Sequence, residues 1–294
     1  MALRQPPPAP AAALTYAAAL ATSAAGAALV ERVLRAHPPG GRAIWERRNH
    51  AGNVVSLHEG PAYVGGAAVG AICGSWVGAR TGRPVGAPTG AAAAWSAVAA
   101  GAVGLLDDLH GDSARKGLRG HVTALTHGQV TTGVVKIVGL AITGVVVADG
   151  VRAPGTAGLR RLGEAVTGGA VIAGSANLVN LLDLRPGRAL KATTIVALAL
   201  ASSRRRHLTG ASALGSALGT IGPDLAGRTM LGDTGANSAG ALLGTAIVAQ
   251  SSPAARAGVL AALIALTLAS EKVSFTRVIE STPVLRTLDA WGRG

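Results

Sequence analysis

Long apolar blocks alternate with short polar connections along most of this chain. Nine blocks fall near residues 11–30, 62–79, 90–106, 131–148, 164–182, 190–202, 208–222, 238–251 and 257–270. A helix satisfies its own backbone hydrogen bonds in lipid, so each block predicts a membrane-spanning helix. The sixth and seventh blocks have the least defined limits, because the short charged connection SSRRRH joins them. The pattern predicts an all-α, polytopic membrane helical bundle with about nine transmembrane helices, forming a single integral membrane domain over 1–294.

The two ends of the chain lack this pattern. Residues 1–10, MALRQPPPAP, predict a disordered tail. The apolar block that follows could be read as a cleaved signal peptide, but its proline-rich start and the basic segment after it favour a first membrane helix. Apolar residues recur at helical spacing within 271–294, which predicts an amphipathic cytoplasmic tail that lies on the membrane or packs against the bundle. These residues are Val284, Leu285, Leu288 and Trp291.

The amino-acid composition supports a membrane protein and argues against a nucleic-acid partner. The chain has 294 residues, of which 49% are hydrophobic and only 14% are charged, which excludes an ordinary soluble domain. Its net charge is +13, from 27 Lys and Arg against 14 Asp and Glu. In a soluble protein this excess would suggest nucleic acid. In a membrane protein it favours anionic lipid and cytoplasmic loops, so no nucleic-acid partner is expected.

The charged residues also predict an orientation. If the connection after the first span is cytoplasmic, that side carries more Lys and Arg than the other, although Arg204, Arg205 and Arg206 oppose the trend. The positive-inside rule then predicts an external N-terminus and a cytoplasmic C-terminus.

Acidic residues follow a stricter pattern than the basic ones. Two spans separate Asp108 from Asp183, and two more separate Asp183 from Asp233. Because an even number of crossings returns the chain to the same face, three acidic motifs are expected to meet at the cytoplasmic surface.

The first of these motifs is the pair Asp107 and Asp108, which closes the apolar run GAVGLL. In the predicted orientation the pair lies at a helix C-terminus, where the helix dipole is negative, so neither carboxylate stabilises its own helix and an N-cap role is excluded. A solvated flank is the alternative. We favour a site for a divalent cation or for proton transfer, since either offsets the repulsion of two adjacent carboxylates.

The second and third motifs place polar residues within or beside apolar spans. Asn177, Asn180 and Asp183 are spaced by three residues and share one broad helix face. Hydrogen bonding between helices is the alternative explanation of the asparagines, but Asp183 at the helix exit favours a functional site. Asp233, in MLGDTGANSAG, is either an N-cap of the following span or part of an anion or metal site to which Gly232 gives close backbone access.

Basic candidates are weaker signals. Lys136 lies one turn inside its span, where it could extend to the interface or bind an anionic headgroup. Lys116 lies in a basic loop and could be solvated only. Arg185 and Arg188 follow Asp183 in the segment LRPGR.

Taken in order, the segments DDLHGD, NLVNLLDLRPG and LGDTG resemble the motifs of the polyprenyl-phosphate N-acetylhexosamine-1-phosphate transferases, the family that includes phospho-N-acetylmuramoyl-pentapeptide transferase. The resemblance covers about residues 60 to 250. It implies a multi-pass enzyme in the plasma membrane of a prokaryote, with a cytoplasmic active site, that serves cell-envelope biogenesis. A polyprenyl phosphate would attack the sugar-linked phosphate of a UDP-amino sugar and release UMP, with Mg²⁺, or Mn²⁺, as cofactor. The resemblance is also compatible with a homodimer.

Roles carried over by position are likewise implied by the resemblance. Asp107, Asp108 and Asp183 would be catalytic, and Asp233 with Asp108 would hold the metal. The other expected substrate-binding residues are Asn177, Asn180, Lys116, Lys136 and Gly232, together with Arg185 and Arg188, which depart from the family motif and are expected to bind phosphate in place of the family's histidines.

Departures from the family pattern keep other functions open. The family's second acid after Asp183 is missing, and no histidine follows His207, although the family carries a histidine-rich loop near its C-terminus. A catalytically inactive relative that binds polyprenyl phosphate or an envelope-assembly partner is therefore the main alternative. A transporter is a third reading, but coupling residues of transporters usually lie near the midplane, whereas these acids are expected at one face.

Overall fold

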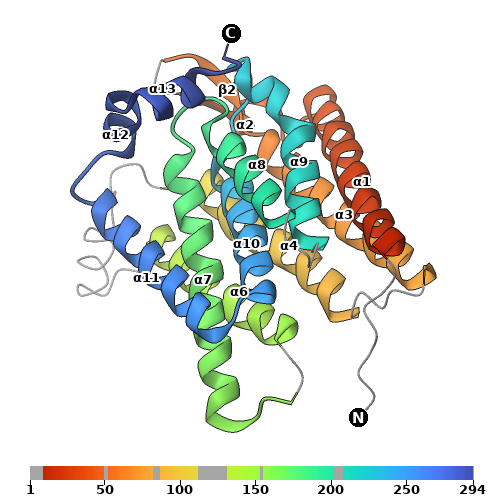
Figure 1. Ribbon diagram of the computed structural model, residues 1–294. Coiled ribbons are helices and arrows are strands. Elements are labelled where there is room, and N and C mark those ends of the chain that lie inside the picture. The colour runs from red at the N-terminus through yellow and green to blue at the C-terminus, as the bar shows by residue number, and fades with distance from the viewer. Residues whose placement is uncertain are drawn as a thin grey trace.

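The predicted apolar blocks coincide with helices. The structure is a computed structural model that describes residues 9–49, 52–81, 87–111, 131–152, 155–201 and 208–293. Each of the nine predicted spans overlaps one long helix within these ranges, so the all-α fold is confirmed (Figure 1). The helices are α1 (Ala9–Ala36), α3 (Glu59–Arg80), α4 (Ala87–His110), α6 (Thr132–Val151), α7 (Gly158–Leu182), α8 (Arg188–Ala201), α9 (Leu208–Leu225), α10 (Gly232–Gln250) and α11 (Pro253–Ser270).

Six helices in the described part of the chain have the length and apolar character needed to cross a membrane, namely α1, α3, α4, α6, α7 and α11. Helix α8 has 14 residues and would extend only about 21 Å, less than the ~30 Å hydrocarbon core of a bilayer. These helices indicate a membrane protein. The number of nine spans and the orientation of the termini stay predictions.

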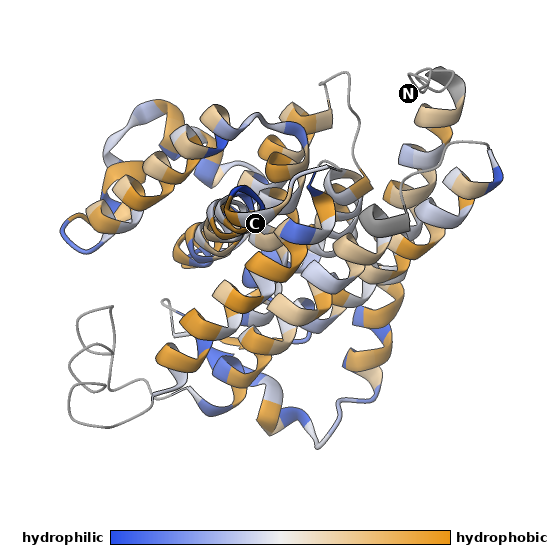
Figure 2. Cartoon of the chain, turned by 90° about the horizontal axis from the view of Figure 1, so that it is seen from below, coloured by the Kyte–Doolittle hydropathy of each residue, from blue (hydrophilic) through white to orange (hydrophobic). Residues whose placement is uncertain are grey.

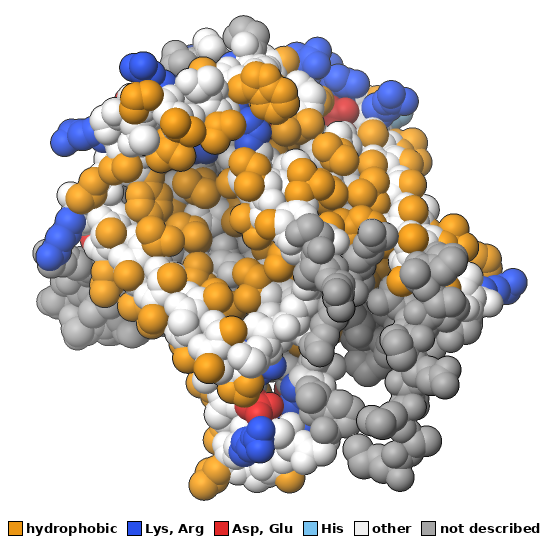
Figure 3. Space-filling model, viewed as in Figure 1, with side chains coloured by type: hydrophobic (Ala, Val, Ile, Leu, Met, Phe, Trp, Pro, Cys, Tyr) orange, Lys and Arg blue, Asp and Glu red, His pale blue; other side chains and the backbone are white. Residues whose placement is uncertain are grey.

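The surface has the distribution of side chains that a bilayer requires. Large apolar side chains point outward from several helices, among them Ile142 on α6 and Leu268 on α11, which are 60% and 57% exposed. Figure 3 shows hydrophobic side chains over the middle of the visible face, with Lys and Arg gathered along the rim near the C-terminal helices. Figure 2 shows the same pattern along the chain, with hydrophobic residues on the helices and hydrophilic ones in several connections. Such extended apolar surface is typical of lipid contact.

Helix α10 lies at the centre of the bundle and packs against α3, α4, α7 and α9. Most of its residues are buried, and they are mainly Gly, Ala, Ser and Thr, whose small side chains let helix backbones approach closely. At Gly240 a Cβ atom would lie 2.5 Å from Cα of Ala176 on α7, so only glycine fits there. The small residues therefore fix α10 against α7.

A short β-hairpin, which the apolar pattern did not predict, lies between α1 and α3. It consists of β1 (Glu46–Arg48) and β2 (Val54–Ser56), paired antiparallel after the four-residue helix α2 (Arg42–Trp45). Ser56 also bonds to the segment before α10, since its N–H donates to the carbonyl of Arg228 at 3.1 Å. The hairpin therefore holds the start of α10 from the predicted cytoplasmic side.

The chain ends agree with the sequence expectations only where they are described. Residues 1–8 of the expected disordered tail lie outside the described residues, and Ala9 begins α1. After α11 come two short helices, α12 (Phe275–Ser281) and α13 (Pro283–Ala290), where an amphipathic segment was predicted.

Candidate functional site

The three acidic motifs meet at the N-terminus of α10. The N–H of Gly232 donates to Oδ2 of Asp183 at 2.8 Å, and the N–H of Asp233 donates to Oδ1 of Asp108 at 3.0 Å. Thr234 donates to Oδ2 of Asp108 from its N–H, at 2.9 Å, and from its hydroxyl, at 2.6 Å. The convergence expected from the even number of crossings is therefore present.

This arrangement has a direct physical cause. The first N–H groups of a helix have no partner within the helix, and the helix dipole is positive there. The residue before α10, Leu231, offers no side-chain cap. Asp108 from the last turn of α4 and Asp183 from the end of α7 supply the acceptors instead. The exclusion of a capping role for Asp108 is thus wrong, because its carboxylate caps a different helix from its own.

Asp233 is not an N-cap, which removes that reading of the third motif. Its side chain accepts a hydrogen bond from Nδ2 of Asn180 at 2.5 Å and forms an ion pair with Nζ of Lys136. The same ammonium lies 3.5 Å from Oδ2 of Asp107. Thr131 caps the start of α6, which places Lys136 one turn inside the helix and level with these carboxylates. The cluster is half-buried and overlies the first turn of α10.

Glycines permit this close approach at two positions. A Cβ atom at Gly104 of α4 would run into the backbone of Asp233 and Thr234, so α4 can meet the start of α10 only without a side chain there. Gly232 has a φ of 63°, in the left-handed region that glycine adopts without strain. Gly232 was expected to offer its backbone to a phosphate, but its N–H group already donates to Asp183.

A cavity of about 400 Å³ opens beside the cluster, between α6, α7 and α11. Asp107, Lys136 and Asn177 form part of its polar lining, and Nδ2 of Asn177 donates to the hydroxyl of Thr267 on α11 at 3.3 Å. Its apolar lining includes Ile137, Leu140, Ala173 and Leu181. Charged groups and apolar side chains thus line one space.

Buried acids that the sequence reasoning missed surround Asp183. Glu59 at the start of α3 is fully buried and accepts from the hydroxyl of Thr229 at 2.5 Å, and Asp224 on α9 accepts from the N–H of Gly187 at 2.9 Å. Burial raises the pKa of Asp183 well above its usual range, and the neighbouring Asp224 raises it further. The available signal was an acid at the edge of an apolar block, as in TIGPDL. Asp183 and Asp224 also line a smaller pocket of about 130 Å³.

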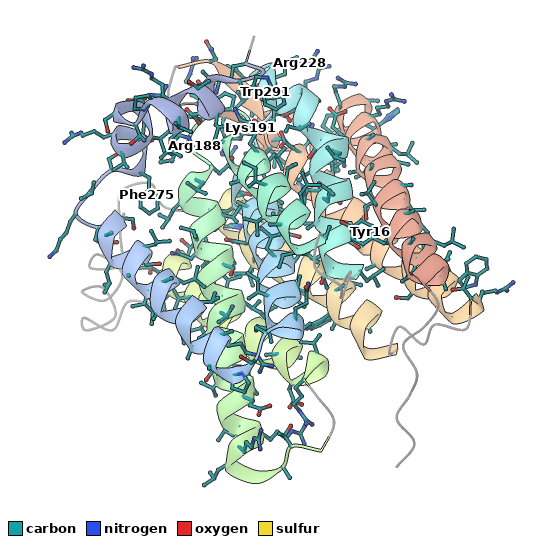
Figure 4. All side chains as sticks on the ribbon, viewed as in Figure 1. Tyr16, Arg188, Lys191, Arg228, Phe275 and Trp291 are labelled. Atoms are coloured by element: carbon teal, nitrogen blue, oxygen red, sulfur yellow. The ribbon has the colours of Figure 1, made fainter. Side chains whose placement is uncertain are left out.

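Arg185 and Arg188 do not join the acidic cluster at the start of α10; they contact the C-terminal segment. Arg188 is buried and bonds to Asp289 with Nε at 2.7 Å and Nη2 at 3.1 Å, while Arg185 pairs with Glu280 at 3.2 Å. Figure 4 shows Arg188 and Lys191 beneath the C-terminal helices. Burial raises the pKa of Asp289, but the bonds from Arg188 and Arg293 outweigh it and hold the pKa below its usual range. The amphipathic segment therefore packs against the bundle.

Lys191 strengthens the same attachment. Its ammonium donates to the carbonyl groups of Leu288, Asp289 and Trp291, at 3.0, 2.5 and 3.0 Å, and so satisfies the free end of α13. Lys116, another residue predicted to bind substrate, lies outside the described residues.

The described residues hold no cluster of three or more His, Cys, Asp or Glu side chains suited to a metal ion. The carboxylates of Asp107 and Asp233 nevertheless share one cation, the ammonium of Lys136. Mg²⁺ is commonly bound by one or two carboxylates together with substrate phosphates, and this pair of carboxylates fits that mode. Comparison with protein-family models gives no match for this chain, and comparison with curated proteins gives none either.

Proposed function

We propose that this protein is an integral membrane glycosyl-1-phosphate transferase, which moves a sugar-1-phosphate from a UDP-amino sugar to a polyprenyl phosphate. The site would face the cytoplasm of a prokaryote and serve envelope biogenesis. The observation that carries the proposal is the meeting of Asp107, Lys136, Asn180 and Asp233 in one cluster, of which Asp107 and Lys136 line a cavity that also has apolar lining. A phosphate on a long apolar chain needs both surfaces at once.

Each part of the cavity suits one part of the lipid substrate. The ammonium of Lys136 would pair with the lipid phosphate, and the wall formed by Ile137, Leu140 and Ala173 would take the first isoprene units. Asp107 is the acid of this group that lines the cavity, so it would accept the proton of a singly ionised lipid phosphate. Lys136 can turn from the carboxylates to a phosphate because its side chain is long and flexible.

The reaction itself is a phosphoryl transfer. An oxygen of the lipid phosphate forms a bond to the sugar-linked phosphorus, and the bond from that phosphorus to the bridging oxygen breaks, so that UMP leaves with both bonding electrons. The products are UMP and a polyprenyl diphosphate sugar. Mg²⁺ or Mn²⁺, held by Asp233, would neutralise charge on the diphosphate. Asp183 and Asn180 would face the nucleotide side, as the resemblance implies.

One observation favours a second candidate, a non-catalytic protein that binds polyprenyl phosphate. Both oxygens of Asp108 accept hydrogen bonds from the first turn of α10, so this carboxylate stabilises the fold whether or not it takes part in catalysis. A protein with this fold and no catalytic activity would keep the same hydrogen bonds.

The deciding experiment supplies the purified protein with undecaprenyl phosphate, Mg²⁺ and a panel of UDP-sugars, and measures UMP release. We expect turnover with at least one donor and a loss of at least about 10²-fold in Asp233→Asn. Asp149→Asn is the matched control, because Asp149 pairs with Arg152 and Arg161 at the opposite end of α6. Binding of the lipid without UMP from any donor would instead establish the non-catalytic function.

A further inference from the structure

A second cavity lies at the other end of the helix pair that borders the acidic site. It has a volume of about 420 Å³ and lies between the first turns of α7 and α11, lined by Glu164, Thr167 and Arg256 among others. Glu164 precedes Asn177 by 13 residues on α7, so the two cavities are about 20 Å apart along that helix. Figure 1 shows α7 and α11 side by side, with their later ends toward the C-terminal helices. The second cavity thus belongs to the opposite leaflet.

The distinctive group in this cavity is a buried arginine. The side chain of Arg256 is 8% exposed, yet no carboxylate oxygen in the described part of the chain lies within 4.0 Å of it. Its Nη2 donates to the carbonyl of Ser251 at 3.2 Å, while its Nε is buried and has no hydrogen-bond partner among the described residues. Arg188, which is buried to a similar degree, pairs with Asp289. Arg256 has no such partner among the residues that the structure describes.

A buried guanidinium without an anion is costly. Arginine keeps its charge at all ordinary pH values, and removing that charge from water costs several kcal/mol unless an opposite charge compensates it. Glu164 lines the same cavity, but its carboxylate pairs with Arg160 at 3.1 Å. The geometry therefore calls for an external anion.

The surroundings indicate what carries this anion. Both helices are of membrane-spanning length, and their N-terminal ends, which are positive, border the cavity. The remaining lining includes Gly163, Pro253 and Ala257, so an apolar chain can enter beside the charge. A small soluble anion would leave this apolar lining without contact.

We propose that the cavity around Arg256 binds the phosphate group of an anionic phospholipid in the leaflet opposite the acidic site. The phosphate accepts hydrogen bonds from the guanidinium, and the acyl chains lie along α11, whose outward side chains Ile264 and Leu268 are exposed. This lipid site is separate from the proposed transferase reaction and does not depend on it.

The test measures lipid binding by the full-length protein in detergent, with native mass spectrometry and thermal unfolding as readouts. Dioleoyl phosphatidylglycerol is the probe, dioleoyl phosphatidylcholine is the zwitterionic comparison, and inorganic phosphate is the free anion. We expect phosphatidylglycerol alone to bind in a defined number and to raise the melting temperature. Arg256→Met should weaken this binding by about ten- to a hundred-fold, since a hydrogen bond to a charged group contributes about 1.5–3 kcal/mol.

Matched variants separate a binding site from a general effect of charge. Arg161→Met removes an exposed charge from the same end of α7, outside the cavity, and should leave phosphatidylglycerol binding unchanged. Arg256→Lys should retain part of it. In detergent without added lipid, Arg256→Met should be at least as stable as the wild type, because it no longer buries an uncompensated charge.

Three results would overturn the proposal. One is unchanged phosphatidylglycerol binding in Arg256→Met, and another is equal stabilisation of the wild type by inorganic phosphate. The third needs no variant: hydrogen exchange of the wild type should slow over residues 251–258 when phosphatidylglycerol is added, and an unchanged rate there would contradict the site even if the variants fail to fold.

Discussion

Lys136 and Asp233 are 97 residues apart in the chain, and their side chains form an ion pair over the first turn of the central helix. The same ammonium approaches Asp107, so one cation compensates two carboxylates from two helices. Substrate phosphates would compete for this cation, and the freed carboxylates would then be available for a divalent ion. The ammonium of Lys136 therefore neutralises the carboxylates of the empty site and would pair with the phosphate of the proposed ligand when it binds.

Substitution of Lys136 should separate binding from folding. Lys136→Met leaves Asp107 and Asp233 as neighbouring carboxylates without a cation, so we expect weaker binding of polyprenyl phosphate but half-maximal activity at a lower Mg²⁺ concentration. Lys136→Arg keeps the charge and should restore part of the affinity. The measurement is the Kd for the lipid and the Mg²⁺ concentration at half-maximal UMP release. A Met variant with unchanged values for both would contradict the phosphate-binding role.

Asp108 and Asp233 should respond differently to the loss of their charge. Asp108→Ala removes the acceptor for the N–H groups of Asp233 and Thr234, so it should lower stability by about 1–2 kcal/mol as well as activity. Asp233→Asn keeps the fold and should lower activity alone. Thermal unfolding beside UMP release checks this difference. Equal stability of both variants would show that the capping bonds contribute little.

The contact between α4 and α10 depends on Gly104. Gly104→Ala adds a Cβ atom that collides with the backbone at Asp233, and overpacking of this kind costs about 1–3 kcal/mol. We expect a lower melting temperature and reduced activity together, since the collision displaces the first turn of α10. Gly258→Ala is the control, because a Cβ atom there meets nothing within 4 Å. A Gly104→Ala protein that melts like Gly258→Ala would argue against this packing.

Attachment of the C-terminal helices should depend on pH. The pKa of Asp289 is lower in the folded protein than in the unfolded chain, so its contribution to stability is present above the unfolded value near ~4 and is lost as the pH falls through the folded value. We expect α12 and α13 to become sensitive to protease at acidic pH. Asp289→Asn should be sensitive already at neutral pH. Acid sensitivity that is identical in Asp289→Asn and wild type would exclude this cause.

The predicted orientation can be tested by labelling. In a Cys73→Ala background, Ser281→Cys in α12 should react with a membrane-impermeant maleimide only from the cytoplasmic side, and Arg161→Cys in α7 only from the external side. Both positions are exposed outside the apolar surface of the bundle. Reaction of both from one side would rule out the proposed topology, and with it a common cytoplasmic face.

The sequence by itself determined the positions of the long helices and the candidate residues. It also determined which motifs share a face, because an even number of membrane crossings returns the chain to the same side. An apolar block shows whether a segment favours lipid or water, and this preference depends only on the residues of that segment. Hence the overlap of each predicted span with a helix, and the meeting of Asp108, Asp183 and Asp233, could be anticipated.

Only the tertiary structure decided which group each charged side chain contacts. Asp108 caps α10, Arg188 holds Asp289, and Glu59 is buried behind Asp183, although nothing near these residues in the chain marks their partners. Such pairings depend on which helices are neighbours and on how each is rotated about its axis. These are set by the close packing of small residues between segments far apart in sequence, so a local pattern of apolar and polar positions does not contain them.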